Sequence, residues 1–239
     1  MTKNNQTTTS KTKTFIVFIF TIIVGYTLFI IPDIFFGVTK INGGKIGINL
    51  FLMALFQIVT VTLLINTSLN LLKKDWKYIG LEFANIKKDI FLGLLFGGLW
   101  TFFQFALIIP NTGAENRADI KGMLAMYDGS IIGTISFIAL GVIGGGITEE
   151  LFNRGYFINI LKDIFNNPKI GIWVSAILSI IIFSFGHIPT DSLEWFDILI
   201  PTIVYTLLFL STKRLTASIM AHGIYNMTAI LLTYYLYYE

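Results

Sequence analysis

Seven long hydrophobic stretches dominate this sequence and limit what it can fold into. They cover approximately residues 15–32, 46–66, 90–110, 130–147, 170–188, 196–212 and 215–237. Inside a bilayer a segment has to pair its own backbone groups, so an apolar stretch of about 20 residues forms a helix. The sequence therefore predicts an all-α fold, a polytopic integral membrane helical bundle with about seven transmembrane helices and a range of six to eight.

The composition supports a membrane protein. Only 13% of the residues are charged, whereas a soluble protein has about 25%. The chain has no cysteine, which excludes disulfides, thiol catalysis and thiolate metal ligands. The net charge of +3 is small. Because the charged residues lie in the loops, they bear on the orientation of the chain in the membrane. We therefore expect a lipid bilayer as its partner and no nucleic acid.

No linker or internal repeat divides the chain, so we expect a single membrane domain over residues 1–239. A polar segment, MTKNNQTTTSKTKT, precedes the first apolar run. No small-residue cleavage site follows that run, and it is long for the apolar region of a signal peptide. We therefore expect the run to be an uncleaved first span.

The connections between the spans alternate in their content of basic residues. Lysines are frequent before the first span (Lys3, Lys11, Lys13), in the 67–89 and 162–169 connections, and in the Lys213-Arg214 turn. The 33–45, 111–129 and 189–197 loops contain fewer basic residues, and the last two carry three acids each. The positive-inside rule then predicts a multi-pass protein of the cell membrane with a cytoplasmic N-terminus. The 67–89 connection is either an amphipathic segment on the inner surface or a plain basic loop.

Two adjacent acids lie in the most apolar part of the chain. Between residues 130 and 161 the charged residues are Glu149, Glu150 and Arg154. A charge at the centre of a bilayer costs about 2.5–3.5 kcal/mol on insertion scales, so it is usually paired, functional or both. Glu150 and Arg154 are four residues apart on one helix face and are expected to form an ion pair. Glu149 points elsewhere and has no local cation. This leaves it available as a general base for water, and the alternative is a structural ion pair beside a spectator acid.

The helix that carries these acids has to be long if they are to meet other polar residues. If it continues to about Lys162, Glu149 reaches a depth similar to that of His187 in the following span. We expect residues 130–162 to form a long broken helix or two short ones. Gly144, Gly145 and Gly146 would then mark either a break or a close helix contact.

The two histidines also lie in hydrophobic stretches. His187 follows Phe183 by one turn, and on their own the two residues fit an interfacial histidine and a packing aromatic. His222 and Asn226 are four apart and share a helix face. Such a pair fits an oxyanion clamp, a metal site or a hydrogen bond to another helix.

Together these residues resemble a known family. Glu149-Glu150-Leu-Phe-Asn-Arg154 matches E-E-x-x-x-R, Phe183-Ser-Phe-Gly-His187 matches F-x-x-x-H, and His222-Gly-Ile-Tyr-Asn226 matches H-x-x-x-N. In this order and spacing the motifs resemble the CPBP family (CAAX proteases and bacteriocin-processing enzymes, the Abi family). Its members are intramembrane endopeptidases related to the type II CAAX prenyl proteases. The resemblance covers about residues 130–230.

The resemblance implies a role for each motif residue. Glu149 and His187 would activate a water, and His222 with Asn226 would stabilise the tetrahedral oxyanion. Glu150, Arg154 and Phe183 would support the site. The implied substrate is a membrane-associated peptide or protein, with bacteriocin self-immunity or peptide maturation as the biological role of a bacterial member.

The sequence favours a reaction without a metal cofactor. The H-E-x-x-H signature of soluble zinc proteases is absent. The alternative is a divalent metal such as Zn held by Glu149, His187 and His222, with one coordination position open. Asn226, one turn from His222, fits an oxyanion hole better than a zinc shell.

Two other functions remain open at this stage. One is a non-catalytic immunity or scaffold protein in the membrane that binds a peptide. The other is a small transporter that uses Glu149, Glu150 and Arg154. Transporters are often built from repeats with matched Gly or Pro breaks. This chain has one glycine cluster of that kind, which argues against the transporter.

Overall fold

The computed structural model describes residues 10–238, which form helices, turns and loops without a β-strand. Seven of its helices are long and apolar enough to cross a membrane, which confirms the predicted all-α fold and number of spans. They are α1 (Lys11–Thr39), α2 (Ile48–Leu71), the α3 helix continued to Asn111 (Ile86–Asn111), a helix from Ile131 to Ile164, α8 (Pro168–Gly186), α9 (Ser192–Thr212) and α10 (Leu215–Tyr237). Of the basic residues used to predict orientation, Lys3 lies outside the described residues.

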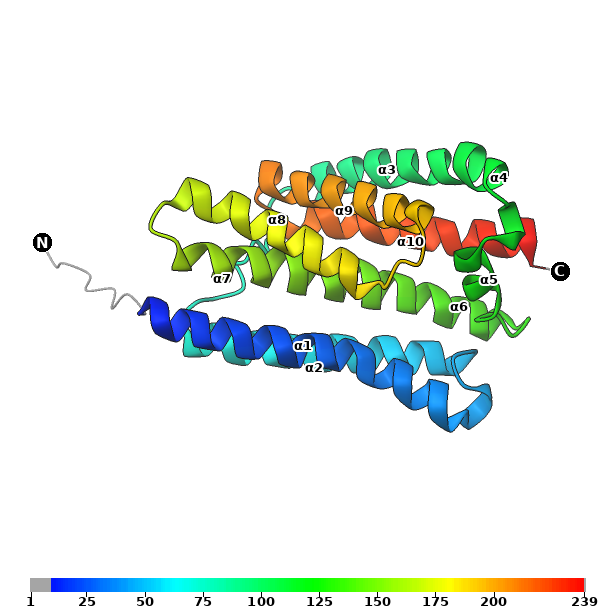
Figure 1. The fold of residues 1–239 in the computed structure, drawn as a ribbon, viewed down its shortest axis with the longest axis horizontal. Coiled ribbons are helices and arrows are strands. Elements are labelled where there is room, and N and C mark those ends of the chain that lie inside the picture. Colours follow the sequence, from blue (N-terminus) through cyan, green and yellow to red (C-terminus); the bar gives the residue numbers. More distant parts are fainter. Residues whose placement is uncertain (1–9, 239) are drawn as a thin grey trace, which may run out of the picture.

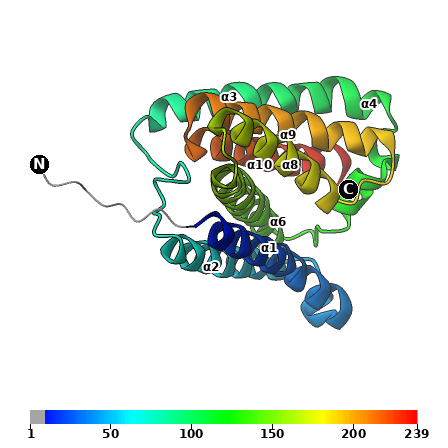
Figure 2. The ribbon, with the colours of Figure 1, turned by 60° about the vertical axis from the view of Figure 1, so that its left-hand side comes forward.

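The helix from Ile131 to Ile164 contains α6 (Ile131–Ala139) and α7 (Asn159–Leu161) and is called the central helix below. In Figures 1 and 2 it runs between α1 and α2 on one side and α3, α8, α9 and α10 on the other. It contacts α2, α8 and α10 along its length. A polar residue on the central helix can therefore meet partners from both sides.

The central helix is continuous, so the prediction of a broken helix or two short helices was wrong. Its backbone is helical where segments join, for example φ −66° and ψ −42° at Glu150. Two stretches, Leu140–Glu149 and Leu151–Ile158, are π-helical, with hydrogen bonds to the residue five positions back. The wider turns keep the backbone paired through the glycine cluster, so no break is needed.

The glycines instead permit a close helix contact, the other alternative for this cluster. A Cβ atom on Gly146 would lie 2.7 Å from Cα of Gly223 in α10. On its other side α10 approaches α3 in the same way, because a Cβ on Gly97 would lie 2.5 Å from the carbonyl oxygen of Ala221. Small residues allow backbones to approach this closely in membrane helices. They hold α10, which carries His222, between two neighbours.

The connection between α2 and α3 fits neither of its two alternatives fully. Residues 72–85 form turns and no helix, yet Ile79 is completely buried in the core. The carbonyl oxygen of Gly80 accepts a hydrogen bond of 2.9 Å from the backbone N–H of Leu215 at the start of α10. This connection is therefore a packed part of one end of the bundle.

The odd number of spans places the start of α1 and the end of α10 at opposite ends of the bundle (Figure 1). The connection between α2 and α3 and the Lys213-Arg214 turn share the end where α1 starts. The residue 40–47 and 112–130 connections lie at the other end. Seven apolar helices whose connections lie at alternate ends of the bundle indicate a multi-pass membrane protein. The orientation of the bundle in the membrane stays a prediction.

Candidate active site

A buried charge cluster joins the central helix to α10. Oε1 of Glu150 lies 3.0 Å from Nη1 of Arg154 and 2.9 Å from Nδ1 of His222. Glu150 and Arg154 are completely buried, and His222 is 8% exposed. The expected Glu150–Arg154 pair is thus present, and it includes a third residue from another motif. The arginine contact is an ion pair without hydrogen-bond alignment, so its N–H groups stay available to further acceptors.

Two aromatic rings hold this cluster from the outside. The guanidinium carbon of Arg154 lies 4.4 Å from the ring centre of Phe183 in α8, a cation–π contact. The ring of Tyr205 in α9 stacks on His222 at 5.0 Å between ring centres. The cluster is therefore held by residues from four helices. Phe183, which the resemblance implies supports the site, contacts Arg154 directly.

Glu149 differs from its neighbour in every respect. It is half-buried, and its carboxylate forms no hydrogen bond or ion pair with any residue between 10 and 238. Its backbone carbonyl accepts a 3.0 Å hydrogen bond from the side chain of Asn153. The hydroxyl of Tyr26 in α1 donates to Oδ1 of Asn153 at 2.8 Å. The backbone of Glu149 is thus held by neighbours, whereas its carboxylate is not.

His222 and Asn226 both face Gly145 of the central helix. A Cβ atom on Gly145 would lie 2.5 Å from Nδ2 of Asn226 and 3.7 Å from Nε2 of His222. The same amide nitrogen of Asn226 donates a 2.8 Å hydrogen bond to the carbonyl oxygen of Gly141, which leaves it one further N–H. The absence of a side chain at Gly145 therefore keeps open the space in front of both nitrogens.

His187 lies at the end of α8 and is exposed. Its Nδ1 is 2.9 Å from the carbonyl oxygen of Phe183, and its ring packs on the Phe183 ring at 4.5 Å. A ring nitrogen that meets a carbonyl has to donate, so in the neutral ring Nε2 is the acceptor. The hydrogen bond from Nδ1 to the carbonyl oxygen of Phe183 thus leaves Nε2 of His187 available as an acceptor.

The depth of His187 follows from the packing of α8. The hydroxyl of Ser179 donates to the carbonyl oxygen of Asn153 at 2.7 Å, and Phe183 covers Arg154 one turn later. The two helices run in opposite directions, so His187, eight residues beyond Ser179, lies about two turns past the level of Asn153, nearer the level of Gly145 than that of Glu149. The side-chain contacts of His187 among the described residues are with Phe183, so a site shared with Glu149 stays a prediction.

The residues do not form a metal site in this structure. Among the described residues no three His, Asp or Glu side chains are grouped closely enough to hold a metal ion. The zinc alternative required Glu149, His187 and His222 to converge, and the described residues hold no such group. The bond from Nδ1 of His222 to Glu150 leaves Nε2 as the ring nitrogen that could meet a ligand. A reaction without a metal therefore stays a prediction.

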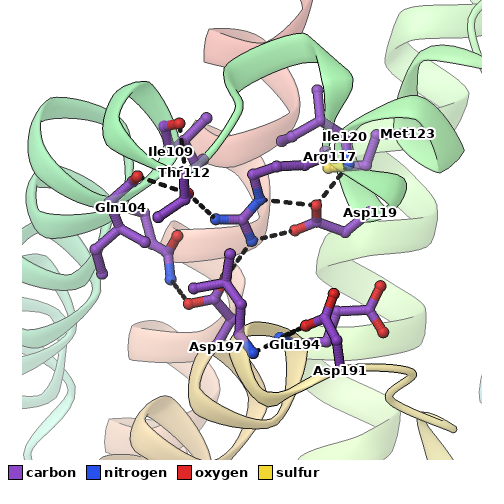
Figure 3. A network of polar contacts seen from close by, with 12 residues as sticks. Gln104, Ile109, Thr112, Arg117, Asp119, Ile120, Met123, Asp191, Glu194 and Asp197 are labelled. Atoms are coloured by element: carbon purple, nitrogen blue, oxygen red, sulfur yellow. Dashed lines mark hydrogen bonds and ion pairs between the residues drawn. The ribbon is translucent and has the colours of Figure 1, made fainter.

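A second buried network lies at the end of the bundle opposite the start of α1. Figure 3 shows Arg117 between Asp119 and Asp197, with Gln104 donating to Asp197. Arg117 donates to both carboxylate oxygens of Asp119 at 2.9 and 2.7 Å, and to the hydroxyl of Thr112 at 3.0 Å. Burial alone would lower the pKa of Arg117, but hydrogen bonds to Asp119 and Asp197 hold it above its usual value. The network fastens the 112–130 loop, which contains α5 (Ala118–Leu124), to the first turns of α9.

The sequence did not reveal several of these residues. Tyr205 and Tyr26 belong to no motif, and Asn153 stands at an unspecified position of E-E-x-x-x-R. Their contacts join helices that are distant in the chain. Gly145 was noticed as part of a glycine cluster, yet its place opposite His222 and Asn226 depends on the continuous central helix. The signals that pointed to this part of the fold were the adjacent acids and the two histidine motifs.

Comparison with known proteins agrees with the motifs. Residues 131–228 match the Rce1-like family, described as type II CAAX prenyl endopeptidase Rce1-like. The match confirms the resemblance to this membrane-protease family. All seven motif residues lie in the matched part.

One relative extends the similarity beyond the motifs. The chain is 25% identical over 182 residues to the UPF0177 protein YvdC of Lactococcus lactis. This alignment covers 76% of the chain, and the chain spans 64% of the length of that relative. No solved structure matches the chain. The similarity therefore reaches into the N-terminal spans, for which the sequence offered hydropathy alone.

Proposed function

We propose that this protein is an intramembrane endopeptidase that hydrolyses a peptide bond in a membrane-associated peptide or protein. The observation that carries the proposal is the contrast between the two adjacent glutamates. Glu150 is fully buried in contact with Arg154 and His222, whereas the carboxylate of Glu149 is half-buried and has no partner among the described residues. A structural ion pair explains Glu150 alone. A free carboxylate beside it fits a general base.

In this mechanism Glu149 takes a proton from a water molecule, and His187 helps to hold that water from the neighbouring helix. The water oxygen attacks the carbonyl carbon of the substrate and forms a tetrahedral oxyanion. Collapse of this intermediate breaks the C–N bond, and the proton on Glu149 passes to the leaving amine. The protein begins and ends the cycle in the same protonation state.

His222 and Asn226 are proposed to stabilise the oxyanion. Nδ2 of Asn226 has one N–H beyond its bond to Gly141, and Nε2 of His222 faces the same space near Gly145. Donation from Nε2 while Nδ1 donates to Glu150 requires a proton on both ring nitrogens. Donors placed in advance around a developing charge are usually a large part of catalysis. Glu150 and Arg154 act as positioning residues, because they hold the His222 ring.

The membrane helices that surround the site agree with the family resemblance. The substrate reaches the site from the bilayer or its surface, and the reaction needs no metal cofactor. The proposed place of the protein is the cell membrane, with a cytoplasmic N-terminus. Bacteriocin self-immunity or peptide maturation is the biological role we favour. A non-catalytic scaffold with the same fold would not need an unpaired Glu149, and the single glycine cluster argues against a transporter.

Cleavage by the detergent-purified protein tests the proposal. The substrates are quenched-fluorescence libraries of farnesylated and unmodified peptides. We expect Glu149→Gln and His222→Ala to lose activity at least about 100-fold, the usual contribution of a general acid–base group. Glu115→Gln, which changes an exposed acid in the 112–130 loop, serves as the matched control and should retain activity.

Cleavage by Glu149→Gln at the wild-type rate would contradict the proposed mechanism. A folded wild-type protein that cleaves no member of the libraries, but still binds a peptide equally well after Glu149→Gln, would support the scaffold function instead.

A further inference from the structure

Lysines surround a cavity at the end of the bundle where α1 starts. The cavity has a volume of about 340 Å³. It lies between the connection of α2 to α3, the last turns of the central helix, α8 and the end of α9. Its lining residues are Lys77, Tyr78, Gly80, Asn159, Lys162, Ile172, Phe209, Leu210 and Lys213. Neither the motifs nor the proposed active site involves this place.

The nearby acid does not neutralise these lysines. Asp163 is engaged by Lys74, whose Nζ lies 2.7 Å from Oδ2, and by the hydroxyl of Tyr78 at 2.6 Å. Lys77, Lys162 and Lys213 form no ion pair with any residue in the described part of the chain. Because the single charge of Asp163 is shared with Lys74, the three lysines of the cavity retain an excess of positive charge.

Lys162 is the inner member of this group. It is half-buried, and its Nζ donates a 2.5 Å hydrogen bond to the neutral side-chain oxygen of Asn159. Asp163 is near enough to favour its charge, whereas Lys74 and Lys213 are near enough to oppose it. The nitrogen also lies 5.1 Å from the ring centre of Tyr78. A partly desolvated ammonium among other ammonium groups is complementary to an anion.

The apolar side of the cavity indicates what kind of anion fits. Ile172 of α8 and Phe209 and Leu210 of α9 form one wall, next to helix surfaces that are apolar and exposed. Basic pockets between membrane helices bind the head groups of anionic lipids. A lipid can place its phosphate among the lysines and its acyl chains along the apolar helices. A free anion has no apolar part that could contact this wall.

We propose that this cavity binds the phosphate head group of an anionic phospholipid, whose acyl chains lie along α8 and α9. The bound head group bridges three parts of the fold: the turn at Lys77, the central helix at Lys162 and the end of α9 at Lys213. Since the central helix also carries the proposed active site, the lipid stabilises the helix that positions it. The inference does not depend on the proposed proteolytic activity.

Thermal unfolding of the full chain in a non-ionic detergent tests the inference. Dioctanoyl phosphatidylglycerol should raise the melting temperature with saturation, whereas dioctanoyl phosphatidylcholine and inorganic phosphate at equal concentration should not. Lys162→Gln and Lys213→Gln should each weaken the apparent affinity about fivefold, and the double variant about 25-fold, since a lysine near anionic lipid contributes about 1 kcal/mol. Lys121→Gln, an exposed lysine at the opposite end, is the matched control and should bind as wild type.

Three results would overturn the inference. The first is an equal shift with phosphatidylcholine, and the second is an unchanged affinity in the double variant. The third is an equal effect of inorganic phosphate, which would assign the cavity to a free anion. If Lys162→Gln fails to fold, the exposed pair Lys77→Gln and Lys213→Gln supports the same measurement.

Discussion

Nδ1 of His222 lies 2.9 Å from Oε1 of Glu150, although 72 residues separate them in the chain. The same carboxylate oxygen also meets Nη1 of Arg154 at 3.0 Å. One buried acid thus links α10 to the central helix and fixes the ring that we propose as an oxyanion donor. The adjacent Glu149 takes no part in this link. Two neighbouring glutamates with identical chemistry therefore have separable tasks.

Substitution of each glutamate should separate stability from activity. Glu150→Gln leaves the Arg154 charge buried without its partner and should lower the free energy of unfolding by about 3–5 kcal/mol. Glu149→Gln removes no contact among the described residues, so its melting temperature should stay at the wild-type value while cleavage is lost. Thermal unfolding and peptide cleavage of the two purified variants check this. Equal melting temperatures for the two variants would contradict the assigned tasks.

The open space at Gly145 should be more important for activity than for stability. Gly145→Ala brings a methyl group against the amide nitrogen of Asn226, which is the movable end of a side chain. We expect the variant to fold but to lose cleavage at least about tenfold. Removing an oxyanion donor entirely lowers kcat by about 10²–10³, and displacing it should cost less. Gly98→Ala, in α3, meets nothing within 4 Å and serves as the control. A fully active Gly145→Ala would show that His222 and Asn226 do not act in this space.

The number of spans and the Glu150–Arg154 pair could be predicted from the sequence because both depend on local spacing. A stretch of apolar residues reports its own length, and residues four apart on a helix meet wherever the helix lies. The link from Glu150 to His222 could not be predicted in this way. It depends on how closely α10 approaches the central helix at Gly146 and Gly223, and a sequence alone does not state which glycines face each other.

The continuity of the central helix shows why the glycine cluster was ambiguous. Glycine weakens a helix in isolation, but it also permits close packing, and here the central helix stays continuous and packs closely on α10. Arg117 was missed for a related reason. Its loop looked like an ordinary charged connection, whereas its three partners Thr112, Asp119 and Asp197 come together only when α9 docks beside the loop.

The Arg117 network should stabilise the protein more than an exposed ion pair does. Asp197→Asn weakens a buried charge-assisted bond and should cost about 1.5–3 kcal/mol of unfolding free energy. Asp33→Asn changes the exposed pair with Lys45 and should cost about 0–1 kcal/mol. Chemical unfolding of both variants measures the difference. Faster proteolysis within residues 112–130 in Asp197→Asn alone would locate the effect, and equal costs would contradict it.

Chelators should leave the reaction unaffected. We propose a reaction that uses a water-activating carboxylate, and no group of three possible metal ligands converges in the described residues. Cleavage should persist within about twofold in EDTA or 1,10-phenanthroline, while a zinc peptidase assayed beside it loses activity. Cleavage that disappears with the chelator and returns with zinc would instead establish the metal alternative.

The orientation of the bundle can be read by labelling, because the chain has no cysteine of its own. Lys77→Cys and Glu115→Cys place one thiol at each end of α3, and both positions are exposed. The excess of lysine at the Lys77 end predicts that this thiol is cytoplasmic. In intact cells an impermeant maleimide should label Glu115→Cys, and Lys77→Cys should react only after permeabilisation.

The reverse pattern would invert the orientation while keeping the seven spans. Labelling of both positions from outside would mean that α3 does not cross the membrane. The expected pattern also places the lysine cavity in the cytoplasmic leaflet, whose anionic lipids attract basic segments near the surface. The labelling result therefore decides which leaflet has to supply the proposed lipid.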